Sequence, residues 1–282
     1  DVPDLSPPRG GRRMGLAAQG LCVAVLLVFS TTGICADSAR RKSAQGRQRR
    51  ELSPGTRVRA RSWSTPPGLE EDRQPRQFEV YGVVASGNRV VQLDPKTGDL
   101  TVIGKLGIDI WMSSLAFDED GQLWGLSWSR RNPRTKGSTR RRRRRRRRQL
   151  VLYRIDMETG EGSEKCRFDI PAGSGGGAGF EFSKDGNRLF WSNARGIYRL
   201  SPNTKKVTKV MDLPQGSYCL ARRPNGHLLA IGIRNRRLTE IDAEENKVVS
   251  DRKLDLPKAA PSLAVTPDNQ LLIETFGGKL YW

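Results

Sequence analysis

The chain has 282 residues, and its 50 Lys and Arg against 30 Asp and Glu give a formal charge of +20. Such a charge is typical of proteins that bind nucleic acid or another polyanion, but residues 1–76 carry +7 of it, residues 129–149 carry +13, and the remainder is neutral. This distribution excludes a DNA-binding surface spread over the whole chain, and a single histidine without any Cys-x-x-Cys pair excludes a structural zinc site.

The N-terminal residues predict export from the cytoplasm. Residues 1–13 precede the first methionine, Met14, and we interpret them as a leader that is not native to the protein. Residues 14–36 contain an apolar run at 21–29 followed by small and polar residues up to Ala36, a pattern that resembles a secretory signal peptide. The run is shorter than the ~20 residues of a membrane span. We expect a secreted, periplasmic or cell-envelope protein with no transmembrane span in its mature form. An uncleaved anchor is the alternative, because 14–20 has no basic residue.

Residues 37–77 form a segment that is rich in Arg, Ser, Gln and Pro and poor in aromatic residues. Such a composition buries too little apolar surface to offset the entropy that is lost on ordering. We therefore predict a disordered basic linker between the signal peptide and a folded region over 78–282.

The folded region contains a repeated sequence pattern, in which an apolar run is followed by a polar turn and then by a second apolar run. The turns lie at Gly121, Gly186, Gly226 and Asn269. The last three are 40 and 43 residues apart, and the first interval of 65 falls to 44 when the 21-residue insert 129–149 is left out. A period of 40–45 residues with strand-like runs is typical of an all-β propeller, in which each blade is a four-stranded antiparallel sheet.

The strands of each blade, labelled a to d from the axis outward, can be assigned from these runs. Strand b is expected at 80–84, 123–128, 189–192, 228–233 and 271–273, and strand c at 90–93, 150–155, 197–200, 238–241 and 280–282. The c–d turns carry Gly98, Gly160, Lys205 and Asn246 at a position that requires left-handed backbone, so Lys205 should be strained.

The repeats amount to about four to five blades. The first copy lacks strand a, which the C-terminal segment would have to supply, unless the chain is a truncated ring of six or seven blades.

Two of these motifs resemble those of known propeller families. The phrase Leu-Phe-Trp-Ser-Asn-Ala-Arg-Gly-Ile-Tyr-Arg-Leu-Ser-Pro-Asn-Thr-Lys at 189–205 resembles repeats of the NHL, YWTD and SMP-30/gluconolactonase-like propellers. The turns Asp-Pro-Lys-Thr-Gly at 94–98 and Asp-Met-Glu-Thr-Gly at 156–160 resemble those of quinoprotein-like and virginiamycin-lyase-like propellers. The resemblance covers 78–282 and implies the fold. Because these groups include lactonases, lyases, dehydrogenases and binding modules, it does not imply one activity.

The resemblance also implies an enzymatic alternative, a metal-dependent lactonase-like hydrolase or lyase. Such hydrolases hold a divalent metal such as calcium in the central channel with acidic and Asn side chains. Glu181 and Glu274 are the acids nearest to the inner strands and are the candidate ligands here, although neither lies in a motif of that family.

Other motifs have simpler interpretations. Asp118-Glu-Asp-Gly121 lacks the further ligands of a calcium loop and is interpreted as an a–b turn. His227 follows the turn at Gly226 and is expected to be solvated, and the glycine run 173–179 lacks the Gly-Lys-Ser/Thr of a phosphate-binding loop. Cys166 and Cys219 are expected to be buried and unpaired.

The insert 129–149 contains 13 Lys and Arg, including nine consecutive arginines at 140–148, and no acid. It is either an expanded codon repeat in a tolerated surface loop or part of a binding face, because it joins strands b and c and all b–c connections emerge on one rim. The a–b and c–d turns on the opposite rim collect Asp and Glu. We predict that the basic rim binds a polyanion, with Trp111 stacking on the ligand. The candidate anion-binding residues are Arg89, Arg130, Arg131, Arg134, Arg140, Arg144, Arg148, Arg195, Arg234, Arg236 and Arg237.

The function expected from these observations is that of a non-catalytic binding or scaffold module, monomeric and without a cofactor. Its expected partner is an acidic polysaccharide, an anionic lipid, a nucleic acid or a protein, held across the basic rim. The metal-dependent hydrolase or lyase is the alternative.

Overall fold

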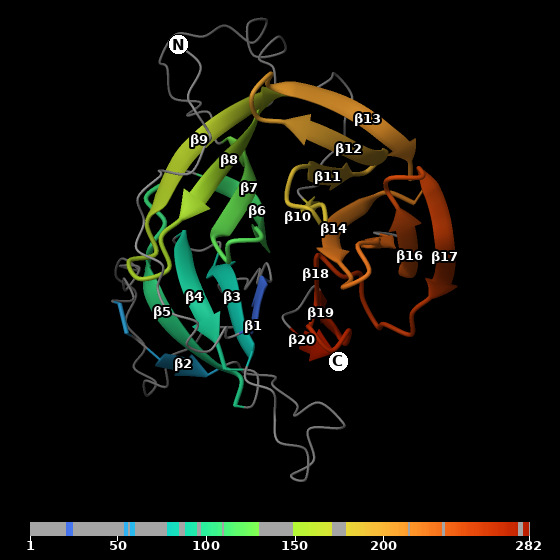
Figure 1. Cartoon of the computed structure of the whole chain (residues 1–282). Helices are drawn as coiled ribbons and strands as arrows, with labels where there is room; N and C mark the ends of the chain where they lie inside the picture. Colours follow the sequence, from blue (N-terminus) through green and yellow to red (C-terminus); the bar gives the residue numbers. More distant parts are fainter. Residues whose placement is uncertain are drawn as a thin grey trace, which may run out of the picture.

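All regular structure in the described part of the chain is β-strand. The computed structural model describes residues 21–24, 54–55, 57–59, 78–84, 88–94, 97–108, 110–129, 149–170, 179–213, 215–232, 235–275 and 279–281. Its strands form five sheets, which follow one another around a common axis in chain order (Figure 1). Within the same ranges, no helix has the length and apolar character needed to span a membrane. The described residues therefore form a β-propeller, as the repeat period predicts, and their five sheets are its blades or parts of blades.

The second, third and fourth sheets are complete blades, each with four antiparallel strands in sequence order from the axis outward. The second consists of β6 (Ile110–Phe117), β7 (Leu123–Ser129), β8 (Gln149–Ile155) and β9 (Gly162–Asp169). The third consists of β10 (Gly179–Phe182), β11 (Leu189–Asn193), β12 (Gly196–Ser201) and β13 (Lys206–Asp212). The fourth consists of β14 (Ser217–Arg222), β15 (Leu228–Gly232), β16 (Arg237–Asp242) and β17 (Lys247–Lys253).

The first sheet takes strands from three separate parts of the chain. Its antiparallel body is β3 (Phe78–Val84), β4 (Arg89–Leu93) and β5 (Asp99–Lys105), with β2 (Arg57–Arg59) on the outer edge. The inner position is held by β1 (Leu21–Ala24), which runs parallel to β3. The sequence predicts that this strand is absent or comes from the C-terminal segment, whereas the structure takes it from the apolar run assigned to the signal peptide.

The strand β2 also departs from the sequence-based expectation, because it lies within the linker predicted to be disordered. Apart from β1, β2, Pro54 and Gly55, the leader, signal peptide and linker predicted over 1–77 lie outside the described residues. Their boundaries, and cleavage near Ala36, stay predictions.

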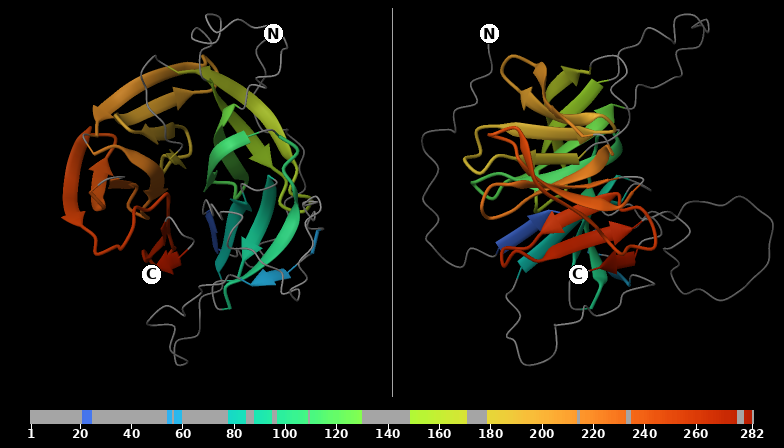
Figure 2. Two further views of the ribbon diagram at one scale, coloured as in Figure 1. Left: turned by 180° about the vertical axis from the view of Figure 1, so that it is seen from behind. Right: turned by 90° about the vertical axis from the view of Figure 1, so that its right-hand side faces the viewer.

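The fifth sheet has three described strands, β18 (Ser262–Val265), β19 (Leu271–Thr275) and β20 (Lys279–Tyr281). The inner strands β1, β6, β10, β14 and β18 lie beside one another in that order, and β18 also approaches β1 (Figure 2). The inner strands therefore surround the axis, although the outer parts of the first and fifth sheets are not paired with each other.

Left-handed turn residues confirm the register of the repeat. In the a–b turns the residues with φ of 74°, 64°, 99° and 67° are Gly121, Gly186, Gly226 and Asn269. In the c–d turns the residues with φ of 73°, 75°, 54° and 54° are Gly98, Gly160, Lys205 and Asn246. Lys205 therefore adopts a backbone conformation that crowds its Cβ, as the sequence predicts.

The described residues include four hydrophobic clusters, each packed between one sheet and the next. Between the second and third sheets, Trp128 meets Trp191 edge to face with ring centroids 6.0 Å apart, and Trp191 packs on Tyr198 at 4.9 Å. These aromatic residues belong to the core between the sheets. Cys166 and Cys219 are buried and unpaired, which is also as predicted.

Candidate functional site

The arginine-rich insert connects β7 to β8 at one rim of the ring. We call the end of the sheets with the b–c and d–a connections the b–c end, and the opposite end, with the a–b and c–d turns, the c–d end. β7 ends at Ser129, β8 begins at Gln149, and their pairing extends to Trp128 and Leu150. The two ends of the insert are therefore neighbours at the b–c end. Residues 130–148 themselves lie outside the described residues.

Arg89 does not present its charge on this rim. It is the first residue of β4, is paired with Val84 on one side and Lys105 on the other, and is only 5% exposed. Its Nη1 is buried and has no hydrogen-bond partner. The prediction that Arg89 belongs to an accessible anion-binding face is wrong on this point, because the side chain is buried.

Arg195 is the candidate that the structure leaves accessible. It lies in the turn between β11 and β12, where the Oδ1 of Asn193 accepts hydrogen bonds from the backbone N–H groups of Arg195 at 2.7 Å and Gly196 at 3.1 Å. The Arg195 carbonyl accepts a further bond from Leu213. The side chain is exposed and has no ion pair with any described residue, so a fixed backbone presents a free guanidinium.

Arg236 and Arg237, at the start of β16, use their guanidinium groups within the fold. Arg236 has a φ of 57°, and its Nη1 donates to the carbonyl of Leu256 in the d–a connection. The Nε of Arg237 lies 2.7 Å from Asp251 Oδ2 on β17. Because Asp251 offsets the charge of Arg237, these two residues contribute less to the rim than the sequence indicates. The remaining candidates, Arg130, Arg131, Arg134, Arg140, Arg144, Arg148 and Arg234, and the side chain of Trp111, lie outside what the structure describes.

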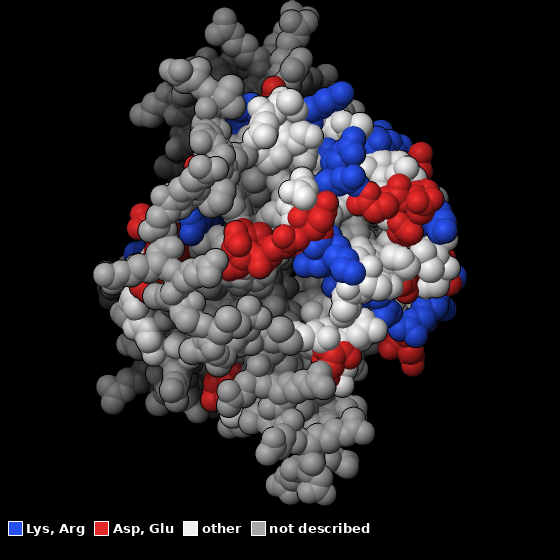
Figure 3. Space-filling model, in the orientation of Figure 1, with Lys and Arg blue, Asp and Glu red and all other residues white. Residues whose placement is uncertain are grey.

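The c–d end is not purely acidic. Its turns contain Asp118, Asp156 and Asp242, as predicted, but Arg188 and Arg223 follow strands at the same end. On the face that Figure 3 presents, acidic and basic side chains of the described residues are interspersed. Segregation of charge between the two ends is therefore incomplete, and the basic character of the b–c end depends on the insert.

The two channel glutamates are separated in the fold. Glu274 is the penultimate residue of β19 near the b–c end, is paired with Ser262 and is 1% exposed. Glu181 lies on β10 in the third sheet, and its Oε1 accepts the N–H of Phe182 at 2.9 Å. Burial raises the pKa of Glu181 to about 7, against the opposing influence of the Arg222 charge and of backbone hydrogen bonds.

Glu181 belongs to the third sheet and Glu274 to the fifth, and the fourth sheet lies between these two in chain order. In the described part of the chain, no three His, Cys, Asp or Glu residues gather closely enough to hold a metal ion. The assignment of Glu181 and Glu274 as metal ligands stays a prediction.

His227 is part of a polar cluster that the sequence does not reveal. Its Nδ1 lies 2.8 Å from Glu240 Oε1, its Nε2 lies 3.9 Å from Asp242 Oδ2, and its side chain is 28% exposed. Burial alone would raise the pKa of Glu240, but the hydrogen bond with His227 and the charge of Arg223 outweigh it and lower that pKa. The expectation of a solvated histidine is wrong, because β16 places two carboxylates beside the turn.

The comparisons with known proteins concern the fold. No family model matches the chain, and no curated protein matches it. Among solved structures, it is similar to hydrazine synthase of Kuenenia stuttgartiensis (17% identity, 68% of this chain, 51% of that chain, TM-score 0.42). It is also similar to the calcium-binding protein regucalcin of Agrobacterium tumefaciens (16% identity, 69% of this chain, 66% of that chain, TM-score 0.43). A gluconolactonase of Xanthomonas campestris is similar to the same degree (14% identity, 70% of this chain, 69% of that chain, TM-score 0.43).

The likeness is one of fold. The chain spans 51% of the hydrazine synthase chain and 66% of the regucalcin chain. The resemblance to gluconolactonase-like propellers inferred from the strand and turn motifs is thus found at the level of architecture. At these identities the activities of the matched proteins do not transfer to this chain.

Proposed function

We propose that this protein is a binding module whose b–c end captures a polyanion. The observation that carries the proposal is the insertion of 13 Lys and Arg, without one acid, between two paired strands of a folded sheet. The rest of the repeat region is neutral. A ligand attracted by charge would therefore be directed to this insert rather than to the ring as a whole.

Arginine is suited to this role because its planar guanidinium donates two parallel hydrogen bonds to a carboxylate or phosphate group. Each such contact releases counterions, so binding weakens steeply with salt. With about six contacts, raising the salt from about 50 to 200 mM lowers affinity by roughly a thousandfold. A strong dependence on salt is thus the property that distinguishes this mode from an apolar interface.

Arg195 supports the insert from the neighbouring sheet. It lies on the b–c turn of the third sheet, is exposed and forms no ion pair with a described residue. Arg237 is the natural contrast, because Asp251 already pairs with it on the same rim of the fourth sheet. We therefore expect Arg195 to contribute to capture and Arg237 to contribute little.

An extracellular acidic polysaccharide is the favoured ligand class, because the N-terminal sequence favours export. Nucleic acid, anionic lipid and an acidic protein surface are the alternatives. Binding measured in parallel to heparin, to single-stranded DNA and to anionic vesicles would rank them.

Heparin chromatography of a length-matched variant tests the proposal. Replacing the nine arginines 140–148 with Ser and Gln keeps the length of the b–c connection and should move elution to much lower salt. Arg237→Gln, with its internal ion pair, should elute close to the unmodified protein. Unchanged elution of the serine-glutamine variant, with an unchanged circular dichroism spectrum, would contradict the proposal and favour a tolerated codon repeat.

The hydrolase alternative has a separate test in the metal content of the purified protein. One bound calcium ion per protein would support this alternative, provided that substituting Glu181 or Glu274 removes both the calcium and the hydrolysis of lactones.

A further inference from the structure

A small polar groove lies between the third and fourth sheets at the c–d end, away from both the insert and the central channel. It has a volume of about 190 Å³ and is lined by side chains of β11, β12 and β13 and of the turn between β16 and β17. Pockets for drug-sized ligands measure about 300–1,000 Å³, so this groove is sized for a smaller group. We call it the Arg199 groove. The lining residues used below are Arg188, Arg199, Thr208, Lys209, Glu244 and Asn246.

The pairing of three strands places Arg199 at the centre of this groove. Arg199 on β12 is opposite Phe190 on β11 and opposite Thr208 on β13, so the three side chains form a row on one face of the third sheet. Phe190 is 3% exposed and packs into the cluster between the third and fourth sheets. Arg199 itself is exposed. The row therefore has a buried apolar residue at its inner end and an exposed cation at its middle.

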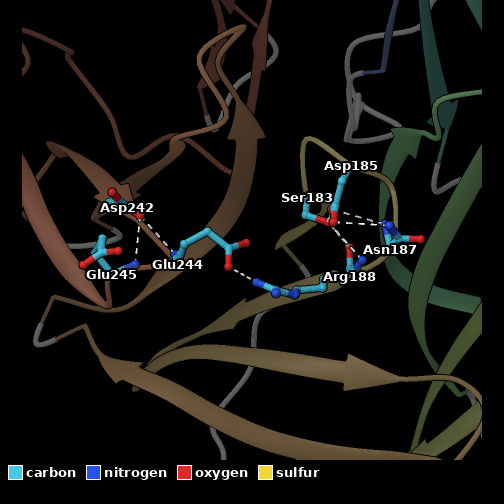
Figure 4. A network of polar contacts seen from close by, with 7 residues as sticks. All are labelled: Ser183, Asp185, Asn187, Arg188, Asp242, Glu244 and Glu245. Atoms are coloured by element: carbon cyan, nitrogen blue, oxygen red, sulfur yellow. Dashed lines mark hydrogen bonds and ion pairs between the residues drawn. The ribbon is translucent and has the colours of Figure 1, made fainter.

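The other two cations of the groove already have acidic partners. Arg188 forms an ion pair with Glu244 across the two sheets, while the backbone of Glu244 donates to Asp242 at 3.0 Å (Figure 4). Lys209 pairs with Asp212 on its own strand. Arg199 has no ion pair with any described residue, so the groove carries a net positive charge that the fold does not offset.

The repeat explains why this arginine is uncompensated. The c–d turns of the first, second and fourth sheets begin with Asp94, Asp156 and Asp242, but that of the third begins with Ser201. In the second sheet Arg154 occupies the place of Arg199, opposite Trp124 and Ser163. The pKa of Asp156, two residues later, is lowered mainly by backbone hydrogen bonds from Thr159 and Glu158 and to a smaller extent by the charge of Arg154. In the third sheet the arginine is present and the acid is missing.

We propose that the Arg199 groove binds a single oxyanion group, a carboxylate or a sulfate, of a small molecule or of one sugar unit. The Arg199 guanidinium donates to the anion, while Arg188 and Lys209 keep their acidic partners Glu244 and Asp212. The Thr208 hydroxyl and the Asn246 amide supply neutral donors, and Glu244 accepts from hydroxyl groups of the ligand. This site does not depend on the binding proposed for the b–c end, because its residues lie at the other end of different strands.

The test is a titration of the full-length protein with sodium sulfate and, separately, with glucuronate, at constant ionic strength. Binding is followed by the backbone amide signals of Thr208 and Lys209 in nitrogen-15-labelled protein, so that anions bound by the insert do not contribute. The ligand that saturates these signals at the lower concentration identifies the oxyanion. Absence of saturable shifts with both ligands would overturn the proposal.

Two variants with a matched control sharpen this test. Arg199→Ala should weaken saturation at least about tenfold, and Ser201→Asp should weaken it comparably by restoring the acid that the other turns carry. Ser201→Asp also keeps the fold, since Asp156 and Asp242 each accept two backbone N–H bonds in the equivalent turns. Arg154→Ala should leave the titration unchanged. An equal loss with Arg154→Ala, or no loss with Ser201→Asp, would show that the groove is not the site.

Discussion

Glu181 lies on the inner strand β10, and replacing it with Gln should change how stability depends on pH. Burial raises the pKa of this carboxyl from 4.5 to about 7. Between these two values the folded protein holds a proton that the unfolded chain has lost. Stability therefore falls as pH rises through this window. The Gln side chain carries no charge and keeps an oxygen that can accept the N–H of Phe182, so Glu181→Gln should remove this fall.

The size of the effect follows from the two pKa values. A shift of one pKa unit corresponds to about 1.4 kcal/mol. Between pH 5 and pH 8 the ionisation of Glu181 should therefore lower the free energy of unfolding by about 2–3 kcal/mol. At an m value of about 2–3 kcal/mol/M, this loss corresponds to a shift of roughly 1 M in the urea midpoint.

Urea unfolding of the unmodified protein and of Glu181→Gln, each at pH 5 and at pH 8, measures the effect. For each protein the change in the free energy of unfolding between the two pH values is determined, and the two changes are compared. The carboxyls whose pKa is lowered, such as Asp156 and Asp185, change stability only at lower pH and do so equally in both proteins. Glu161→Gln, at an exposed turn position, is the control and should show the pH dependence of the unmodified protein. If Glu181→Gln loses as much stability as the unmodified protein between the two pH values, the carboxyl is not buried and the reasoning fails.

The remaining predictions concern the core and the turns. Trp191→Ala should lower the free energy of unfolding by about 3–5 kcal/mol, because the indole is fully buried between the second and third sheets. Val248→Ala on β17, where the side chain is 48% exposed, should cost less than about 0.5 kcal/mol in the same urea experiment. Lys205→Gly should raise stability by about 0.5–1 kcal/mol in thermal unfolding, because φ is 54° there. Lys206→Gly, at the start of β13, should lower it, and stabilisation by both glycines would contradict the explanation from strain.

The repeat architecture could be predicted from sequence because each of its signals is local. The positions Leu123, Leu189, Leu228 and Leu271 all begin the second strand of their blades. A turn position with left-handed backbone favours Gly or Asn. Because such a position lies within a few residues of the strands that the turn joins, the pattern of Gly and Asn indicates the register of the strands. The inner strand of the first sheet is different, because it comes from a distant segment. The apolar run at 21–29 has a composition that suits a signal peptide and a buried strand alike.

The chemistry of the b–c end could be predicted only in part. The positions of Arg89 and Arg237 near that end follow from the repeat, but their partners do not. Arg89 is buried in the folded chain, and the charge of Arg237 is offset because β17 places Asp251 diagonally across from it, opposite Thr239. Likewise His227, which directly precedes β15, contacts Glu240 on β16, 13 positions later in the chain. Such contacts depend on which side chains cross-strand pairing brings together, and composition does not contain that information.

The Arg199 groove combines both kinds of information. The sequence alone shows that the aspartate which begins the other c–d turns is replaced by Ser201, and that Arg199 two residues earlier resembles Arg154 of the preceding blade. It does not show that the next blade closes the space beside this arginine, or that Glu244 from that blade is already engaged by Arg188. A repeat position becomes a candidate site when a local substitution removes a charge partner and the neighbouring sheet supplies none. In an architecture of near-identical blades, the departures from the repeat are therefore where specific binding should be sought.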